Sequence, residues 1–157
     1  ELIKLKPKMV RIYPVLVIHN TKLEKDYLEG KYKPLTVVQA VETCKEIVPI
    51  FREKGIDIIR IGLQTTDEIT SSNSQIVGPV CDNFAEYVLS KIVLDGIEKY
   101  ISKNNIKYEE NIKKKINIYT NNNYASIIVG PEKVNKKYLK EKYGIDIKIK
   151  GENKWKK

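Results

Sequence analysis

Two apolar, β-branched segments with a helical segment between them constrain the fold most. They are residues 10–18 (VRIYPVLVI) and residues 56–63 (IDIIRIGL). Continuous apolar runs of this kind are typical of strands buried on both faces of a parallel sheet. Two strands joined by a helix make a βαβ unit with parallel strands and a right-handed crossover. The sequence therefore predicts an α/β fold for this part of the chain.

The segment between the two runs carries its own start and stop signals. Thr36 and Gln39 have the spacing of a capping box, and Gly55 is placed to end the helix. Pro49 is expected to kink the helix near its end. Apolar residues recur at spacings of three and four, which predicts one buried face: Val37, Val41, Cys44, Val48 and Phe51. Residues 22–34 form a polar connector with room for a short helix.

The polar segment at residues 65–75 is predicted to be a loop that divides the chain into domains 1–75 and 76–157. Asp82 is expected to cap a long helix with a broad apolar stripe. A strand, a short helix, a helix and a strand are then predicted at residues 116–119, 123–129, 132–143 and 145–149. The predicted fold class is therefore α/β followed by an α+β module.

The net charge of +9 lies at one end of the chain. Residues 103–157 hold 15 Lys and Arg against 6 Asp and Glu, whereas residues 1–102 hold 14 of each. A one-sided basic region is typical of proteins with a phosphate-rich partner. Lysine used for solubility gives the same composition, so charge alone leaves both interpretations open.

Catalytic and metal-binding residue types are scarce. Cys44 and Cys81 are far apart in sequence, which fits a reducing, cytoplasmic location, and with one histidine they make no usual zinc site. We predict no metal ligands and no catalytic residues. No apolar run reaches the roughly 18 residues of a membrane span, so no membrane partner is expected. His19 follows the first apolar run, but a lone histidine is more often a surface or packing residue, and its role stays open.

Gly62 and Gln64 stand at the end of the second predicted strand. A glycine inside a strand marks close approach by a ligand or by another backbone. Ligands of α/β sheets bind beyond the carboxyl ends of strands, where Gln64 could hydrogen-bond a small molecule. Alternatively, Gly62 only permits tight packing and Gln64 begins the loop.

These segments also resemble a known family. The run RIYPVLVI, its downstream spacing and the run IRIGLQ are similar to radical-SAM proteins related to the catalytic subunit of Elongator. The bacterial members are described as resembling oxygen-independent coproporphyrinogen oxidase. The resemblance covers roughly residues 8–100 and rests on Arg11 to Ile18, Thr21, Tyr27, Gly30 to Tyr32, Leu35, Thr36, Ile59 to Gln64, Gly78, Pro79 and Phe84.

In that family, a partial (β/α) barrel holds a [4Fe–4S] iron–sulfur cluster on a CxxxCxxC loop and cleaves S-adenosylmethionine to a radical. This sequence has no such motif. The resemblance therefore implies a C-terminal fragment that supplies the last two barrel strands, is inactive and cofactor-free alone, and partners the N-terminal barrel of its parent. It implies these cofactor-binding residues: Arg11, Tyr13, Arg60, Gly62 and Gln64.

Residues 116–149 are similar to a minimal KH core, whose GxxG loop approaches nucleic-acid phosphates. The loop is Gly130-Pro131-Glu132-Lys133, with lysine in place of the second glycine. The resemblance implies RNA contacts from Gly130, Pro131, Lys133, Lys136, Lys137 and Lys140. The alternative is a degenerate KH-like fold used for packing or dimerisation.

The leading hypothesis is a fragment of a radical-SAM enzyme that completes the S-adenosylmethionine and substrate pocket and recruits RNA, with tRNA modification as the expected activity. The alternative is a fragment of a radical-SAM oxidoreductase acting on a small molecule such as a tetrapyrrole, with a structural or dimerising C-terminal module. A homodimer of the fragment is also expected, because an isolated parallel pair exposes its strand edges.

Overall fold

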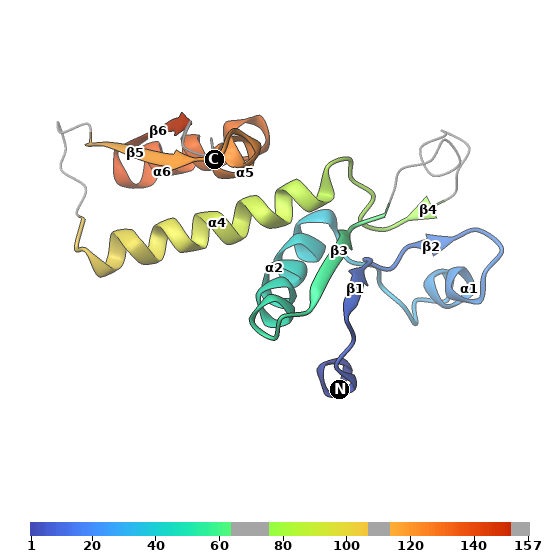
Figure 1. Ribbon diagram of the computed structural model, residues 1–157. Coiled ribbons are helices and arrows are strands. Elements are labelled where there is room, and N and C mark those ends of the chain that lie inside the picture. The colour runs from blue at the N-terminus through green and yellow to red at the C-terminus, as the bar shows by residue number, and fades with distance from the viewer. Residues whose placement is uncertain (64–75, 107–113, 152–157) are drawn as a thin grey trace. The chain divides into compact units, whose positions relative to one another are not determined.

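The computed structural model describes residues 1–63, 76–106 and 114–151 (Figure 1). The chain forms two compact units, Glu1–Val88 (unit 1) and Leu89–Lys157 (unit 2). The boundary falls inside the long helix α4 (Phe84–Lys103). The loop expected at residues 65–75 lies outside the described residues.

Unit 1 contains the predicted βαβ arrangement. Strands β1 (Met9–Ile12) and β3 (Asp57–Ile61) are parallel, and helix α2 (Val37–Glu53) connects them. The predicted capping box is present at the start of α2, which continues through Pro49. After the helix, Gly55 adopts a φ of 66°, and the N–H groups of Gly55 and Ile56 donate to carbonyls of the last turn. This Schellman pattern confirms Gly55 as the stop signal.

The first apolar run is not one strand, and this expectation was wrong. β1 stops at Ile12, and β2 (Val17–Ile18) pairs instead with β4 (Ile76–Val77) in an antiparallel bridge. Pro14 lies in the gap, and proline lacks the N–H that a continuing ladder needs. The chain then enters α1 (Lys22–Leu28), the short helix expected in the polar connector. A 3-10 turn, η1 (Leu2–Leu5), precedes β1.

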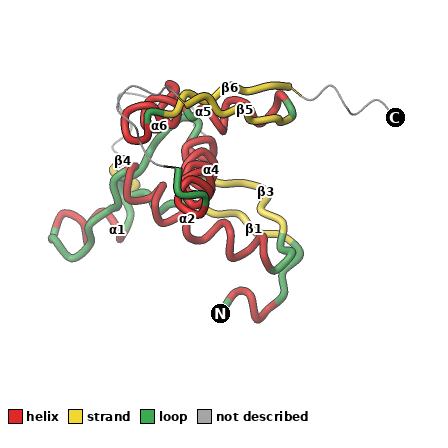
Figure 2. The backbone as a smooth tube through the Cα atoms, turned by 90° about the vertical axis from the view of Figure 1, so that its left-hand side faces the viewer, coloured by secondary structure: helices red, strands yellow, loops and turns green. Residues whose placement is uncertain are grey.

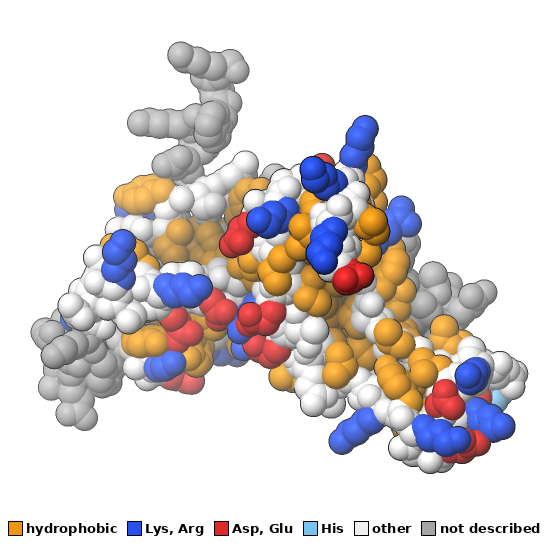
Figure 3. Space-filling view, turned by 90° about the horizontal axis from the view of Figure 1, so that it is seen from below, with side chains coloured by type: hydrophobic (Ala, Val, Ile, Leu, Met, Phe, Trp, Pro, Cys, Tyr) orange, Lys and Arg blue, Asp and Glu red, His pale blue; other side chains and the backbone are white. Residues whose placement is uncertain are grey.

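Among the described residues, α2 covers one side of the β1–β3 pair and the other side is exposed. Helix α2 turns its apolar face inward and buries Val41, Cys44, Val48 and Phe51. On the other side, Met9 is 54% exposed and Ile59 is 50% exposed, beside exposed Arg11 and Arg60. The register shifts between Val10 and Arg11, so Ile59 is an extra residue on β3. Hydrophobic side chains also reach the surface over much of the face drawn in Figure 3.

Unit 2 has a second parallel pair, β5 (Lys114–Thr120) and β6 (Ile145–Gly151), which lie side by side in Figure 2. The elements between them are η2 (Asn122–Tyr124), α5 (Ala125–Val129), η3 (Pro131–Lys133) and α6 (Val134–Tyr143). The predicted order of strand, short helix, helix and strand is present. Gly144 ends α6 with a φ of 65°, as its position predicted.

The core of unit 2 joins α4 to these elements. Its buried members are Leu94, Ile101, Ile128, Leu139, Ile145 and Ile147. Helix α4 begins at Phe84, so the residue directly before it is Asn83. The sequence had predicted Asp82 at this capping position. Asn83 has a φ of 57°, a left-handed conformation that asparagine tolerates better than most residues.

Candidate functional site

The carboxyl ends of β1 and β3 meet at one edge of unit 1, because the strands are parallel. A small pocket lies at this edge, lined by Pro14, Leu16, Leu63, Pro79, Val80, Cys81 and Phe84. The first two residues follow β1, Leu63 follows β3, and the other four come from the segment that enters α4. In open α/β sheets this is the place where ligands bind. Its lining is almost entirely apolar, which suits an apolar or aromatic group.

Gly62 allows the side chain of Phe84, which lines the pocket, to pack closely against the end of β3. Its φ is 82°, and a Cβ added there would lie 2.9 Å from both Cβ and Cδ1 of Phe84. Its N–H donates to the carbonyl of Ile12 across the pair at 2.9 Å. The close approach at Gly62 is therefore made by the Phe84 side chain, which lines the pocket. Direct contact of Gly62 with a cofactor stays a prediction.

Three of the other predicted cofactor-binding residues lie in or directly after β1 and β3. The strand register pairs Arg11 with Arg60, and both are exposed on the side that α2 leaves uncovered. Tyr13, 43% exposed, comes directly after β1 and directly before the pocket residue Pro14. The structure thus brings two arginines and a tyrosine to the same end of the pair. Gln64 lies outside the described residues.

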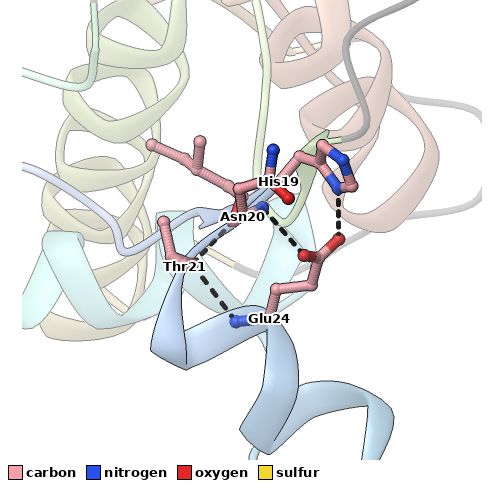
Figure 4. Close-up of polar contacts among 5 residues, drawn as sticks. His19, Asn20, Thr21 and Glu24 are labelled. Atoms are coloured by element: carbon pink, nitrogen blue, oxygen red, sulfur yellow. Dashed lines mark hydrogen bonds and ion pairs between the residues drawn. The ribbon is translucent and has the colours of Figure 1, made fainter.

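His19 is not isolated (Figure 4). Its Nδ1 lies 2.8 Å from Oε1 of Glu24, and the N–H of Asn20 donates to Oε2 of Glu24 at 2.9 Å. The hydrogen bond from His19, and then the one from Asn20, lower the pKa of the Glu24 carboxyl. The N–H of Glu24 donates in turn to the Thr21 hydroxyl at 3.2 Å. These contacts fix the turn from β2 into α1, so His19 has a structural role here.

Gly130, the first glycine of the GPEK loop, is buried within unit 2. Its φ is 81°, and a Cβ there would lie 2.9 Å from Oγ of Ser90 and 2.9 Å from Cγ1 of Val134. The next turn is held by Asn135, 1% exposed, whose Nδ2 donates to the carbonyl and the hydroxyl of Ser90, both at 2.9 Å. Packing against α4 thus requires a glycine at this position.

The lysines predicted to contact RNA follow this loop. Lys133, Lys137 and Lys140 are exposed, and Pro131 is partly buried. Lys136 forms an ion pair with Asp146, with 3.2 Å between Nζ and Oδ1. Lys133 adopts a φ of 63°, so its backbone keeps the left-handed conformation that a second glycine would favour.

A cluster around Glu98 was not predicted from the sequence. The hydroxyls of Tyr138 and Tyr143 donate to Oε1 of Glu98 at 2.9 and 2.7 Å, and Nζ of Lys142 donates to the same atom at 2.9 Å. Lys142 also lies 5.0 and 5.1 Å from the centroids of the two rings. Burial alone would raise the pKa of Glu98, but these three hydrogen bonds together lower it. The cluster fastens α6 to α4.

In the part of the chain that the structure describes, no three His, Cys, Asp or Glu residues are grouped to hold a metal ion. Among the described helices, none is long and apolar enough to cross a membrane. Cys44 is buried on the inner face of α2, and Cys81 donates its thiol to the Asp82 carbonyl. These two cysteines cannot supply the three ligands of a CxxxCxxC cluster site.

A comparison with protein families assigns the chain to a family. A family model described as the Radical_SAM C-terminal domain matches residues 7–93, more than half of the 157 residues. The chain is thus a radical-SAM protein. It belongs to the Radical_SAM C-terminal domain family, and the match includes β1, β3 and the whole pocket. No curated protein and no solved structure matches the chain. Radical-SAM proteins use S-adenosylmethionine and a [4Fe–4S] cluster, so the family implies both in the parent protein.

Proposed function

We propose that unit 1 supplies the closing strands of a radical-SAM barrel and completes the pocket for S-adenosylmethionine and the substrate. The observation that carries this proposal is the uncovered side of the β1–β3 pair, where Met9 and Ile59 are half exposed. In (β/α) barrels, helices cover the outside and strand side chains fill the interior. The uncovered side, opposite α2, is therefore the barrel interior, and further strands of the parent protein cover it.

The residues of this chain then have defined roles at the carboxyl edge. Arg11 and Arg60, paired in register, supply two guanidinium groups for a carboxylate or phosphate of the cofactor or substrate. Tyr13 offers a ring and a hydroxyl beside them. The apolar pocket closed by Phe84 receives an aromatic or aliphatic part of the ligand. The cluster ligands come from the rest of the parent protein, because the two cysteines here do not fit that task.

This role is tested in the full-length parent enzyme. We expect Arg11→Ala to weaken S-adenosylmethionine or substrate binding about tenfold or more, the loss of one charge-assisted contact. Binding is measured by equilibrium dialysis, and turnover by the 5′-deoxyadenosine released. The control is Arg52→Ala, an exposed arginine on α2, on the opposite side of the pair. Equal effects of the two substitutions would contradict the proposal.

We further propose that unit 2 recruits RNA, with tRNA as the expected substrate. Residues 89–157 hold 17 Lys and Arg against 8 Asp and Glu, whereas residues 1–88 hold 12 of each, so unit 2 carries the whole net charge. Exposed Lys133, Lys137 and Lys140 extend from the GPEK loop along α6. Ammonium groups arranged in this way bind phosphates and release counterions.

Filter binding of the chain to bulk tRNA at low and high salt tests this recruitment. Binding at low salt is expected to weaken steeply as salt rises, and Lys133→Glu with Lys137→Glu and Lys140→Glu should reduce both affinity and salt slope. The control reverses three exposed lysines of unit 1, Lys22, Lys33 and Lys54. No binding at low salt, or equal losses in both triple variants, would contradict RNA recruitment by this face.

One observation favours the alternative of a parent enzyme acting on a small molecule such as a tetrapyrrole. Ser90 and Val134 occupy the space beside Gly130, so a phosphate does not reach that side of the glycine. Unit 2 would then be structural or dimerising. A folded dimer without RNA affinity, found by light scattering together with the filter assay, would support this alternative.

A further inference from the structure

We propose that the exposed face of the β5–β6 sheet binds a single-stranded segment of RNA. This face, called here the β5–β6 platform, consists of Lys115, Asn117, Tyr119, Asp146, Lys148 and Lys150. The inference rests on the proposed RNA role of unit 2, but it assigns that role to a different surface from the GPEK loop and α6.

The platform follows from strand alternation. Side chains of a strand point alternately to its two faces. Ile116 and Ile118 on β5, with Ile147 and Ile149 on β6, pack into the core of unit 2. The residues between them therefore share the opposite face. The register places Asn117 beside Lys148 and Tyr119 beside Lys150, so the platform residues form two adjacent rows.

Tyr119 gives the platform a stacking group. Its side chain is 60% exposed, so packing within unit 2 does not explain an aromatic residue there. The ammonium of Lys150 lies 5.7 Å from the centroid of the ring. Base stacking on an aromatic side chain contributes about 1–3 kcal/mol per base and tolerates any base. A neighbouring ammonium can then neutralise the phosphate of the stacked nucleotide.

The charge of the platform fits a polyanion. Lys115, Lys148 and Lys150 are exposed, and the register partner of Lys115 is Asp146, whose carboxylate pairs with Lys136 at 3.2 Å. Asn117 adds an amide that can donate to and accept from a base edge. In an A-form duplex the bases are stacked on one another and cannot stack on Tyr119, whereas an unpaired strand presents its base faces. The fitting occupant is therefore single-stranded RNA.

Fluorescence anisotropy with a labelled oligouridine of about 12 nucleotides tests the platform on the whole chain. Tyr119→Ala is expected to weaken binding about 5- to 150-fold, and Tyr119→Phe is expected to retain it. Lys148→Ala with Lys150→Ala should reduce the salt slope by about 1.4, since each phosphate contact on a single strand contributes about 0.7. The matched control is Tyr100→Ala, because Tyr100 on α4 is also exposed, at 58%. Circular dichroism confirms that each variant is folded.

The outcomes separate this inference from the proposed RNA role. Loss of binding in the α6 triple variant, with Tyr119→Ala unchanged, would overturn the platform and leave RNA recruitment standing. Absence of binding in the unmodified chain at low salt would overturn both. If a duplex of the same length binds as tightly, and Tyr119→Ala weakens its binding by the same factor, the single-strand preference would be overturned. If anionic lipid vesicles bind as tightly as the oligouridine and this binding also depends on Tyr119, the ligand of the platform would be a membrane surface and not RNA.

Discussion

The two units are built around the same element, a two-stranded parallel sheet with helices on one face, and they differ in the other face. In unit 1 that face carries Met9 and Ile59, both about half exposed, with two arginines. In unit 2 it carries three lysines, an asparagine, Tyr119 and one carboxylate, Asp146. Exposure of the apolar face to water costs free energy until something covers it, whereas the basic face is stable in water and attracts anions.

This difference separates two kinds of function. Within the part of the chain that the structure describes, β1 and β3 pair with each other alone. Their exposed apolar side chains and outer edges suit extension by further strands of the same protein. Unit 2 instead closes its core with polar contacts, through Asn135 to Ser90 and through the cluster at Glu98. We therefore expect unit 1 to be part of a larger sheet and unit 2 to be a self-contained module.

The strongest test of a self-contained unit 2 removes a side chain from its core. Leu139 is 0% exposed, and Leu139→Ala should destabilise unit 2 by about 2–5 kcal/mol through lost burial and a cavity. Hydrogen exchange with mass spectrometry should show reduced protection in β5, α6 and β6 and unchanged protection in α2. Val134→Ala on the same helix, at a residue 42% exposed, is the control. If α2 loses protection in step with α6, the two units fold as one body and the comparison fails.

A smaller effect is expected at the pocket of unit 1. Gly62→Ala places a Cβ 2.9 Å from Phe84 at a φ of 82°, so overpacking should cost about 1–3 kcal/mol. Gly96→Ala is the matched control, because Gly96 lies in α4 with nothing within 4 Å of an added Cβ, and alanine there should stabilise by up to about 1 kcal/mol. Urea unfolding measures both. Equal midpoints for Gly62→Ala and the unmodified chain would mean that Phe84 does not close the pocket.

The Glu98 cluster gives unit 2 a dependence on pH. Because hydrogen bonds lower the pKa of Glu98 in the folded state, its stabilising effect is present above the unfolded pKa of about 4.3 and is lost as pH falls through the folded value. Glu98→Gln should therefore destabilise unit 2 at neutral pH, by less than Gly62→Ala destabilises unit 1, and the difference should shrink toward about pH 3. Thermal unfolding across this range measures it. Exposed Glu141→Gln is the control, and a difference that stays constant with pH would contradict the role of charge.

Much of the fold could be predicted because its signals are local. The capping box at Thr36, the stop at Gly55 and the stop at Gly144 each depend on a few adjacent residues, and each is present. The break in the first apolar run had a local signal too, in Pro14. The apolar composition of the run favoured one strand, but the missing N–H of proline ended it.

The site was less predictable, because its contacts join distant parts of the sequence. Gly62 was recognised as a point of close approach, but nothing near it in the sequence indicated Phe84 as the neighbour. Asn135 and Ser90 are separated by 45 positions, and Glu98 and Tyr138 by 40, so no spacing rule reveals them. His19 and Glu24, five positions apart, could have been paired from the sequence.

The smallest expected effect concerns the starts of two helices, one in each unit. Helix α2 begins with a complete capping box, whereas α6 begins after Lys133, which has a φ of 63° and no side-chain cap. The left-handed conformation costs a non-glycine residue roughly 1–2 kcal/mol of strain. Glycine avoids this strain, but it loses roughly 0.5–1 kcal/mol more conformational entropy on folding. Lys133→Gly should therefore stabilise unit 2 by about 0.5–1 kcal/mol in urea unfolding. Lys133→Ala removes the same charge and keeps the strain, so it should give no gain. Equal stabilities for the two variants would show that the loop relaxes without glycine, and that the contrast between the helix starts has no energetic consequence.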